Sequence, residues 1–476
     1  MSNTTSKNNP SPQPEKKTSH RTINFDQTRL SRTLFTLALP AVVENILSLS
    51  VYIIDAILVG HLHSESALAG TVLSGTIMML IQTPFQAMGV ATIALVARSW
   101  GEQDIPKARR YARQSISLAW ILSLVLAIVG FLFAFQMIHW MKAAPDVIQA
   151  GGSFMRIIIL SLPFQIPMFI CSGIFRGSGD TRTPMYITGI INVLNVLISW
   201  VLAFGIGPFP KMGLMGVAWG TMIAQSVGGM IALTILVQGW SNLRIPIWGL
   251  FTWNKSIIYQ IWIIAYPVMI ERFITTSAQV VFYGIITRLG TTALAAHNVA
   301  LRVESIAFQP PWGVNVAVAT IVGQALGARQ TQFAELTVKK GLQWIGIGMA
   351  FLSVAFLLFS HQFVQIFGAT PEVLRQAGIV LKIAAVEFPF IAFFAVLSGC
   401  LRGAGDTRSP LYVMLICLAV FRFGVVYLFA IVFNWGLPGV WWATTLDWMA
   451  RAGGLWYVFH KGAWKYTYDR LLDKKI

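Results

Sequence analysis

Six acidic side chains stand within or beside long apolar stretches of the chain, out of 18 acidic residues in all: Glu44, Asp55, Glu271, Glu304, Glu387 and Asp447. If these stretches lie in a bilayer, each buried carboxylate costs about 2.5 to 3.5 kcal/mol on insertion scales and needs a partner, a proton or a function. A carboxylate in such surroundings can bind a proton or a small cation, or attract a cationic solute. The six residues are therefore the first candidates for chemistry.

Two of these acids follow a proline by four residues, Glu44 after Pro40 and Glu271 after Pro267. A proline within a helix frees the carbonyl of the preceding turn and kinks the helix, which favours a polar cavity nearby. We expect Glu271 to face a cleft, whereas Glu44 has two open roles, in the cleft or as a structural hydrogen-bonding group. Asp55 follows Glu44 by eleven residues, about three helical turns, so the two share a helix face.

The other acids have neutral explanations beside functional ones. Glu387 can attract a cationic substrate or pair with Lys382, and the sequence leaves both open. Asp447 and Arg451 have the i, i+4 spacing of an ion pair within a helix. Glu304, close to an arginine at a helix end, is expected to be structural.

The composition places the elements that carry these acids in a membrane. Hydrophobic residues make up 56% of the 476 residues and charged residues only 11%, with a mean hydropathy of +0.67, whereas soluble domains have roughly a quarter of their residues charged. Long unbroken apolar runs such as residues 118–135 favour helices over a barrel of alternating strands. Apolar runs of spanning length predict twelve transmembrane helices, starting near residues 34, 67, 115, 152, 185, 212, 257, 293, 341, 378, 410 and 437.

An internal repeat organises these helices. The segment from Arg176 to Pro184, RGSGDTRTP, returns as RGAGDTRSP from Arg402 to Pro410, a displacement of 226 residues (402 − 176). Segments near the first span repeat at 227 residues and segments near the last at 223. The chain is therefore a duplicated six-helix unit, and because six is even, the halves should be related by a pseudo-two-fold axis along the membrane normal. Asp55 corresponds in this repeat to Phe282, so its charge is not merely an inherited fold element.

The fold class we predict is an all-α integral membrane protein of two six-helix bundles, with a binding cleft between them. The predicted segments are a disordered cytoplasmic tail (1–30), an N-terminal lobe (31–243), a cytoplasmic linker (244–256), a C-terminal lobe (257–462) and a cytoplasmic tail (463–476).

The net charge of +17 is a topology signal. The basic residues gather in the tails and in alternate loops, which is the positive-inside pattern and places both termini in the cytoplasm. We therefore expect a multi-pass protein of the cell inner (plasma) membrane, with no cleaved signal peptide and no nucleic acid partner. Cys171, Cys400 and Cys417 form no C-x-x-C pair, so neither a disulfide framework nor a metal knuckle is expected.

The sequence carries no sign of nucleotide or enzyme chemistry. No Gly-Lys dipeptide occurs, which excludes a Walker A loop, and the repeated Arg-Gly-x-Gly-Asp stretch follows a transmembrane helix with the wrong glycine spacing for a nucleotide fingerprint. The seven histidines are scattered, so we do not expect an enzyme. No cofactor is expected, and energy should come from an ion gradient.

The chain resembles the multidrug and toxic compound extrusion (MATE) family in its bacterial branches. The resemblance rests on Asp55 in its Tyr-x-x-Asp-x-x-x-x-Gly context, the stretch Gly290–His297, both Arg-Gly-x-Gly-Asp loops and the six-plus-six repeat. It implies a V-shaped pair of bundles that couples drug export to the entry of protons or sodium ions.

The resemblance also implies site residues. The family's cation site in the N-terminal lobe corresponds to Asp55, Asn195 and Thr221, which would bind H⁺ or possibly coordinate Na⁺; where a second aspartate is common, this chain has Ser199, which favours protons. Glu271 matches the family's seventh-span glutamate. The family's tenth-span acid would fall at Ile391, and Glu387, one turn earlier, is the suggested substitute.

These observations predict an antiporter, coupled to H⁺ or Na⁺, that exports small, mainly cationic organic compounds or drugs by alternating access. Asp55, Asn195 and Thr221 would couple the ion, and Glu271, Glu387 and Glu44 would form the substrate site or a second ion site. We expect a monomer in the lipid bilayer. The alternative is a lipid-linked oligosaccharide flippase, whose cavity would be lined by arginine and lysine rather than by carboxylates.

Overall fold

The computed structural model describes residues 26–62, 64–246, 253–468 and 470, and every regular element among them is helical. The first half holds η1 (Gln27–Arg29), α1 (Leu30–Gly60), α2 (Glu65–Gly101), α3 (Ile105–Trp140), α4 (Pro145–Ile159), α5 (Leu162–Gly177), α6 (Arg182–Phe204) and α7 (Leu214–Gln238). The second half holds α8 (Lys255–Thr287), α9 (Thr291–Ala307), α10 (Gln309–Gly327), α11 (Thr331–Gln365), α12 (Pro371–Gly403), α13 (Arg408–Cys417), the π-helical segments η2 (Leu418–Val425) and η3 (Leu428–Val432), α14 (Gly436–Lys461) and η4 (Ala463–Tyr466).

These elements form twelve spans in two six-helix lobes, which confirms the predicted fold class. Nine helices of the described chain are long and apolar enough to span a bilayer, and α4 with α5, bent by 57°, makes a tenth candidate. The remaining spans are α9 with α10, broken near two prolines, and α14, which carries Asp447 and Arg451. Polar residues in these two spans explain why hydropathy marks them less clearly.

Four helices begin earlier than predicted. The third and ninth spans start at Ile105 and Thr331 rather than near 115 and 341, and the fourth and tenth start at Pro145 and Pro371 rather than near 152 and 378. The extra turns of α3 and α11 are rich in charged residues. Hydropathy locates only the lipid-embedded part of a helix, while backbone hydrogen bonding continues into the aqueous layer.

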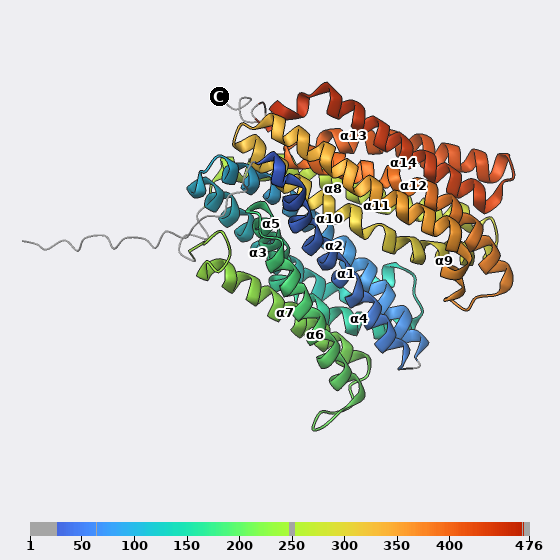
Figure 1. Cartoon of the computed structure of the whole chain (residues 1–476). Helices are drawn as coiled ribbons and strands as arrows, with labels where there is room; N and C mark the ends of the chain where they lie inside the picture. The colour runs from blue at the N-terminus through green and yellow to red at the C-terminus, as the bar shows by residue number, and fades with distance from the viewer. Residues whose placement is uncertain (1–25, 63, 247–252, 469, 471–476) are drawn as a thin grey trace, which may run out of the picture.

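The two lobes meet at one end of the molecule and diverge toward the other (Figure 1). At the meeting end, which we call the closed end, α2 touches α10 without intervening side chains. A Cβ atom on Gly101 would overlap the backbone carbonyl of Gln324, and one on Gly327 would overlap that of Arg98. Glycine at these positions allows the two backbones to approach closely, as small residues do between membrane helices.

The first helix of each half is shared between the lobes. Leu30, Leu34 and Leu37 at the start of α1 are buried in the core of the C-terminal lobe, whereas Val59 near its end packs in the N-terminal lobe. The start of α8 likewise contributes Ile261 to the core of the N-terminal lobe. The predicted lobe boundaries therefore describe the order along the chain, and both first helices cross between the bundles.

The terminal segments are only partly described. The tail predicted to be disordered lies outside the described residues up to residue 25, but residues 27–29 form η1, and Leu30 is buried. After α14, Trp464 and Tyr468 are buried too, so the chain remains packed against the lobes beyond the last span. The predicted linker lies partly outside the described residues, and the division into segments stays a prediction.

Candidate functional site

Three helices of the N-terminal lobe bring Asp55, Asn195 and Thr221 together. The hydroxyl Oγ1 of Thr221 lies 3.1 Å from Oδ2 of Asp55 and 3.0 Å from the carbonyl of Val217, either of which can accept its proton. Asn195 donates from Nδ2 to the same hydroxyl oxygen at 2.9 Å. The residues come from α1, α6 and α7 and are all buried.

Two oxygens of this cluster have no partner among the described residues. Oδ1 of Asp55 and Oδ1 of Asn195 are buried and accept no hydrogen bond. Carboxylate, amide and hydroxyl oxygens are the ligands that hard cations prefer, and a proton on Asp55 would satisfy the carboxylate equally well. Ser199, where the family often has a second acid, is buried and spends its hydroxyl on the Val217 carbonyl at 3.4 Å. The residues present therefore fit a single small cation, H⁺ or Na⁺.

The two proline-linked glutamates form ion pairs that repeat between the halves. Glu44 of α1 pairs with Arg176 of α5 at 2.6 Å, and Glu271 of α8 pairs with Arg402 of α12 at 2.7 Å. In both pairs the glutamate Oε2 and the arginine Nε are buried without a partner. The duplicated unit thus conserves one ion pair with the same single contact in each half, and both predicted acids are neutralised.

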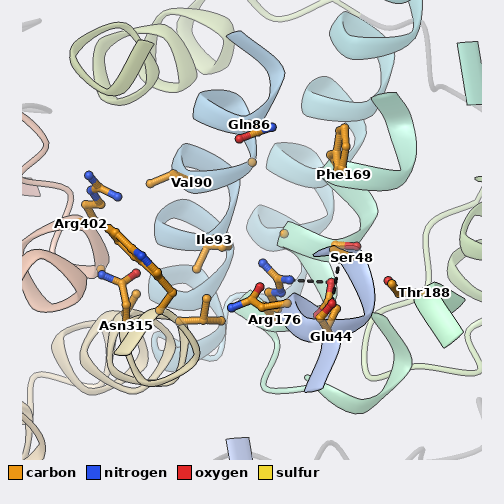
Figure 2. A pocket seen from close by; sticks show the side chains of 18 of the residues that line it. Glu44, Ser48, Gln86, Val90, Ile93, Phe169, Arg176, Thr188, Asn315 and Arg402 are labelled. Carbon is orange, nitrogen blue, oxygen red and sulfur yellow. Dashed lines mark hydrogen bonds and ion pairs between the residues drawn. The ribbon is translucent and has the colours of Figure 1, made fainter. Parts of the chain in front are cut away.

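A cavity of about 420 Å³ lies between the lobes. Figure 2 shows the Glu44–Arg176 pair on one side and Arg402 with Asn315 on the other, with Val90 and Ile93 of α2 between them. The other lining groups include amides, hydroxyls and apolar side chains, among them Asn45, Ser48, Gln86, Phe169, Ser172 and Trp312. A cavity of this size suits a drug-sized molecule, since such sites have roughly 300 to 1,000 Å³.

The cavity lining carries more positive than negative charge. One acid, Glu44, and three arginines, Arg176, Arg272 and Arg402, line it. Arg272 is exposed to the cavity, and within the described chain no hydrogen bond or ion pair holds it. The neighbouring carboxylate of Glu271 is already held by Arg402. Arg272 is therefore the free charge of this cavity.

Glu387 lies inside the C-terminal lobe and does not line the central cavity. It is fully buried, and the hydroxyl of Thr445 lies 3.4 Å from its Oε2. Lys382, the partner that the sequence allowed, is exposed and makes no ion pair with it among the described residues. Glu387 is thus placed where it cannot meet a solute in this cavity.

The other predicted pairing in this lobe is confirmed. Asp447 accepts two hydrogen bonds from Arg451, each of 2.8 Å, and Arg422 approaches its Oδ2 at 3.5 Å. Glu304 is buried and feels the charges of Glu387 and Arg422, but within the described chain it makes no ion pair with the arginine two residues before it. The interior of the C-terminal lobe is a network of fixed charges.

The sequence analysis missed the roles of Arg176 and Arg402, which it treated as loop cations that report topology. A signal was available, because the acid and the arginine of each pair are duplicated at nearly the same displacement. Two residues that are retained together in both copies of a repeat can be tested as a pair.

The comparison with known families follows from this architecture. The sequence profile of the MatE family matches residues 40–201 and, separately, residues 267–428. The chain belongs to the MatE family. The two matches begin 227 residues apart (267 − 40) and so confirm the duplication. Among curated relatives, the probable multidrug resistance protein NorM of Thermotoga maritima is 28% identical over 441 residues, which cover 92% of this chain and 93% of the relative.

Solved structures share the fold of this MatE protein. The Vibrio cholerae MATE transporter VcmN in its bent form superposes with a TM-score of 0.85 at 18% identity, covering 93% of this chain and 99% of that one. A MOP superfamily transporter from Pyrococcus furiosus gives 0.85 at 20% identity, covering 94% and 99%. The family, the two-lobe fold and membership among multidrug efflux transporters are therefore established.

Proposed function

We propose that this MatE protein is an antiporter of the plasma membrane that exports small organic compounds, mainly cationic ones, by alternating access, driven by the entry of H⁺ or Na⁺. The observation that carries the proposal is the buried Asp55–Asn195–Thr221 cluster with its two unpartnered oxygens. A cation bound there neutralises Asp55 and fills the unused hydrogen-bonding capacity of the cluster.

The coupling follows from helix packing. Asp55 lies on α1, whose other end is buried in the C-terminal lobe, while Asn195 and Thr221 lie on α6 and α7. Binding or releasing a cation changes how α1 packs against α6 and α7, and therefore biases the relative position of the lobes. An ion can shift this equilibrium only by its difference in affinity for the two lobe arrangements.

The test compares Asp55→Asn with wild type in everted membrane vesicles that take up a fluorescent organic cation. Asp146→Asn, which changes an exposed acid at the start of α4, is the matched control. Uptake should be abolished in Asp55→Asn and unchanged in Asp146→Asn. A proton gradient without sodium and a sodium gradient at equal pH, imposed separately, identify the ion. Equal gradient-driven uptake by wild type and Asp55→Asn would refute the proposed role.

Arg272 supports a second candidate for the substrate, a compound that also carries an acidic group. Because both lining acids have arginine partners, an organic cation must compete with a guanidinium for them, whereas a carboxylate or phosphate meets Arg272 without displacing anything. Arg272→Gln should lower transport of zwitterionic and anionic aromatic compounds at least tenfold and leave purely cationic dyes unchanged, with Arg272→Lys intermediate. The reverse order of effects would eliminate this candidate.

The family match favours export of small compounds over the flippase alternative, and so does the cavity size. A purified flippase in liposomes would translocate a fluorescent lipid-linked pyrophosphate without any ion gradient. We expect no such translocation here.

A further inference from the structure

The duplication assigns every residue of the N-terminal cation cluster a counterpart in the other lobe. At the displacement of 227 between the two family matches, Asp55 corresponds to Phe282 and Asn195 to Arg422. In the last span, where GLMGV at 213–217 returns as GLPGV at 436–440, the displacement is 223, and Thr221 corresponds to Thr444. The counterpart of an acid, an amide and a hydroxyl is therefore a phenyl ring, a guanidinium and a hydroxyl.

The hydrogen bonds show that this correspondence is structural. Thr444 donates to the carbonyl of Val440 at 3.0 Å, as Thr221 does to that of Val217 at 3.0 Å. Arg422 donates from Nη1 to the Thr444 hydroxyl oxygen at 3.0 Å, as Asn195 donates to Thr221 at 2.9 Å. The same polar contact is thus kept in both lobes, with a cationic donor in place of a neutral one.

Positive charge already occupies the C-terminal counterpart. The Arg422 guanidinium carbon lies 4.8 Å from the centre of the Phe282 ring, the residue that replaces Asp55, and its Nε lies 3.5 Å from Oδ2 of Asp447. Cations over aromatic faces are attracted to the ring. An arginine stays protonated throughout the physiological range, and its covalent tether prevents it from leaving.

We propose that Arg422 is a built-in cation that permanently fills the C-terminal counterpart of the N-terminal cation site, so that the coupling ion binds in the N-terminal lobe alone. This inference rests on the proposed function of Asp55 and adds a limit of one coupling ion per transport cycle. The C-terminal lobe keeps the polar framework of the site but cannot load and unload it.

The backbone around Arg422 supports a specialised site. Arg422 lies in the π-helical segment η2, whereas its counterpart Asn195 lies in the continuous α-helix α6. π-helical turns are rare and occur frequently at functional positions. The wider turn changes the direction of the side chains that follow it, and Arg422 reaches Thr444 and Asp447 from it.

The first test counts bound ions on the purified full-length protein, by equilibrium binding of radioactive sodium and, separately, by proton titration against Asp55→Asn. We expect one ion for wild type and none for Asp55→Asn. Two ions for wild type, with one remaining in Asp55→Asn, would overturn the role of Arg422 while leaving Asp55 as a coupling residue. No loss of binding in Asp55→Asn would instead overturn the proposed function itself.

The second test removes the built-in cation. Arg422→Ala should lower ion-coupled uptake in proteoliposomes at least tenfold, and millimolar guanidinium should restore a large part of it, while equimolar potassium should not. Arg422→Lys should retain most activity because it keeps a charge near Thr444 and Asp447. Arg422→Ala with full uptake, or without any rescue in protein that is folded by size-exclusion chromatography, would contradict the proposal.

The third test rebuilds the site by exchange between the lobes. Phe282→Asp with Arg422→Asn gives the C-terminal lobe the residue types of the N-terminal cluster. This double variant should bind two ions, and adding Asp55→Asn should reduce the number to one. If the folded double variant binds one ion as wild type does, the guanidinium is not what excludes the second ion, and the proposal fails.

Discussion

The repeated ion pairs allow a quantitative test in which one half serves as the control for the other. Glu271→Gln removes the only hydrogen-bonded partner of the Arg402 guanidinium, whose side chain is 5% exposed. Breaking a buried ion pair by removing one member costs about 3 to 5 kcal/mol, because the remaining charge is left without compensation. Glu44→Gln removes the equivalent partner from Arg176, but that side chain is 18% exposed. Water can replace part of the lost contact there, so we expect a cost of about 1 to 3 kcal/mol.

The pairs themselves should contribute little net stability. Each has one short contact and leaves a glutamate oxygen and an arginine nitrogen buried without partners, so the geometry falls short of a bidentate pair. Replacing both members, as in Glu271→Met with Arg402→Met, should therefore be close to neutral, within about 1 kcal/mol. The single and double variants together separate the cost of an orphaned charge from the value of the pair.

The assay is thermal unfolding of the purified protein in detergent. With a shift of roughly 2 to 4 °C per kcal/mol for a unit of 150 to 250 residues, Glu271→Gln should unfold roughly 10 °C below wild type. Glu44→Gln should unfold a few degrees below it, and the double methionine variant close to it. Equal small shifts for both single variants would refute the reasoning, because they would mean that water reaches both arginines alike.

Three further outcomes are expected. A Cβ atom on Gly323 would lie 2.8 Å from that of Ala97, so a disulfide between Ala97→Cys and Gly323→Cys should lock the closed end and stop transport until a reductant is added, as measured by uptake before and after reduction. Thr221→Val should weaken coupling-ion binding roughly tenfold by removing one hydrogen bond to the cluster, while Thr221→Ser should retain it. Burial raises the pKa of Tyr468 above its ordinary value, so this phenol stays neutral and bonded to Tyr111 at 3.1 Å in mildly alkaline solution. Tyr468→Phe should lower stability by about 1 kcal/mol, and the loss should not change with pH below about 10.

Much of the architecture could be predicted because its signals are local. The repeat, the twelve spans and the pairing of Asp447 with Arg451 follow from spacing along the chain. The early starts of α3 and α11 could not be found in this way, since hydropathy reports lipid contact and not hydrogen bonding. The choice of helix type around Arg422, π rather than α, leaves no signal in the apolar pattern either.

The site required knowledge of which helices touch. Sequence reasoning offered Glu44, Glu271 and Glu387 as acids facing a cleft, and the structure pairs the first two with arginines and places the third inside a lobe. Contacts between distant helices depend on tertiary packing, which the order of residues does not reveal. Asp55, Asn195 and Thr221 were grouped by resemblance to a family, and their proximity is geometric; their role in coupling stays a prediction.

The sharing of α1 between the lobes bears on how the chain assembles during synthesis. Leu30, Leu34 and Leu37 are buried against residues of α9, α10 and α11, which a ribosome makes more than two hundred residues later. Until then the apolar face of the first helix must be covered by lipid. A fragment that stops after α7 would therefore insert, yet it could not complete its native packing, and the two halves would have to be made together to associate.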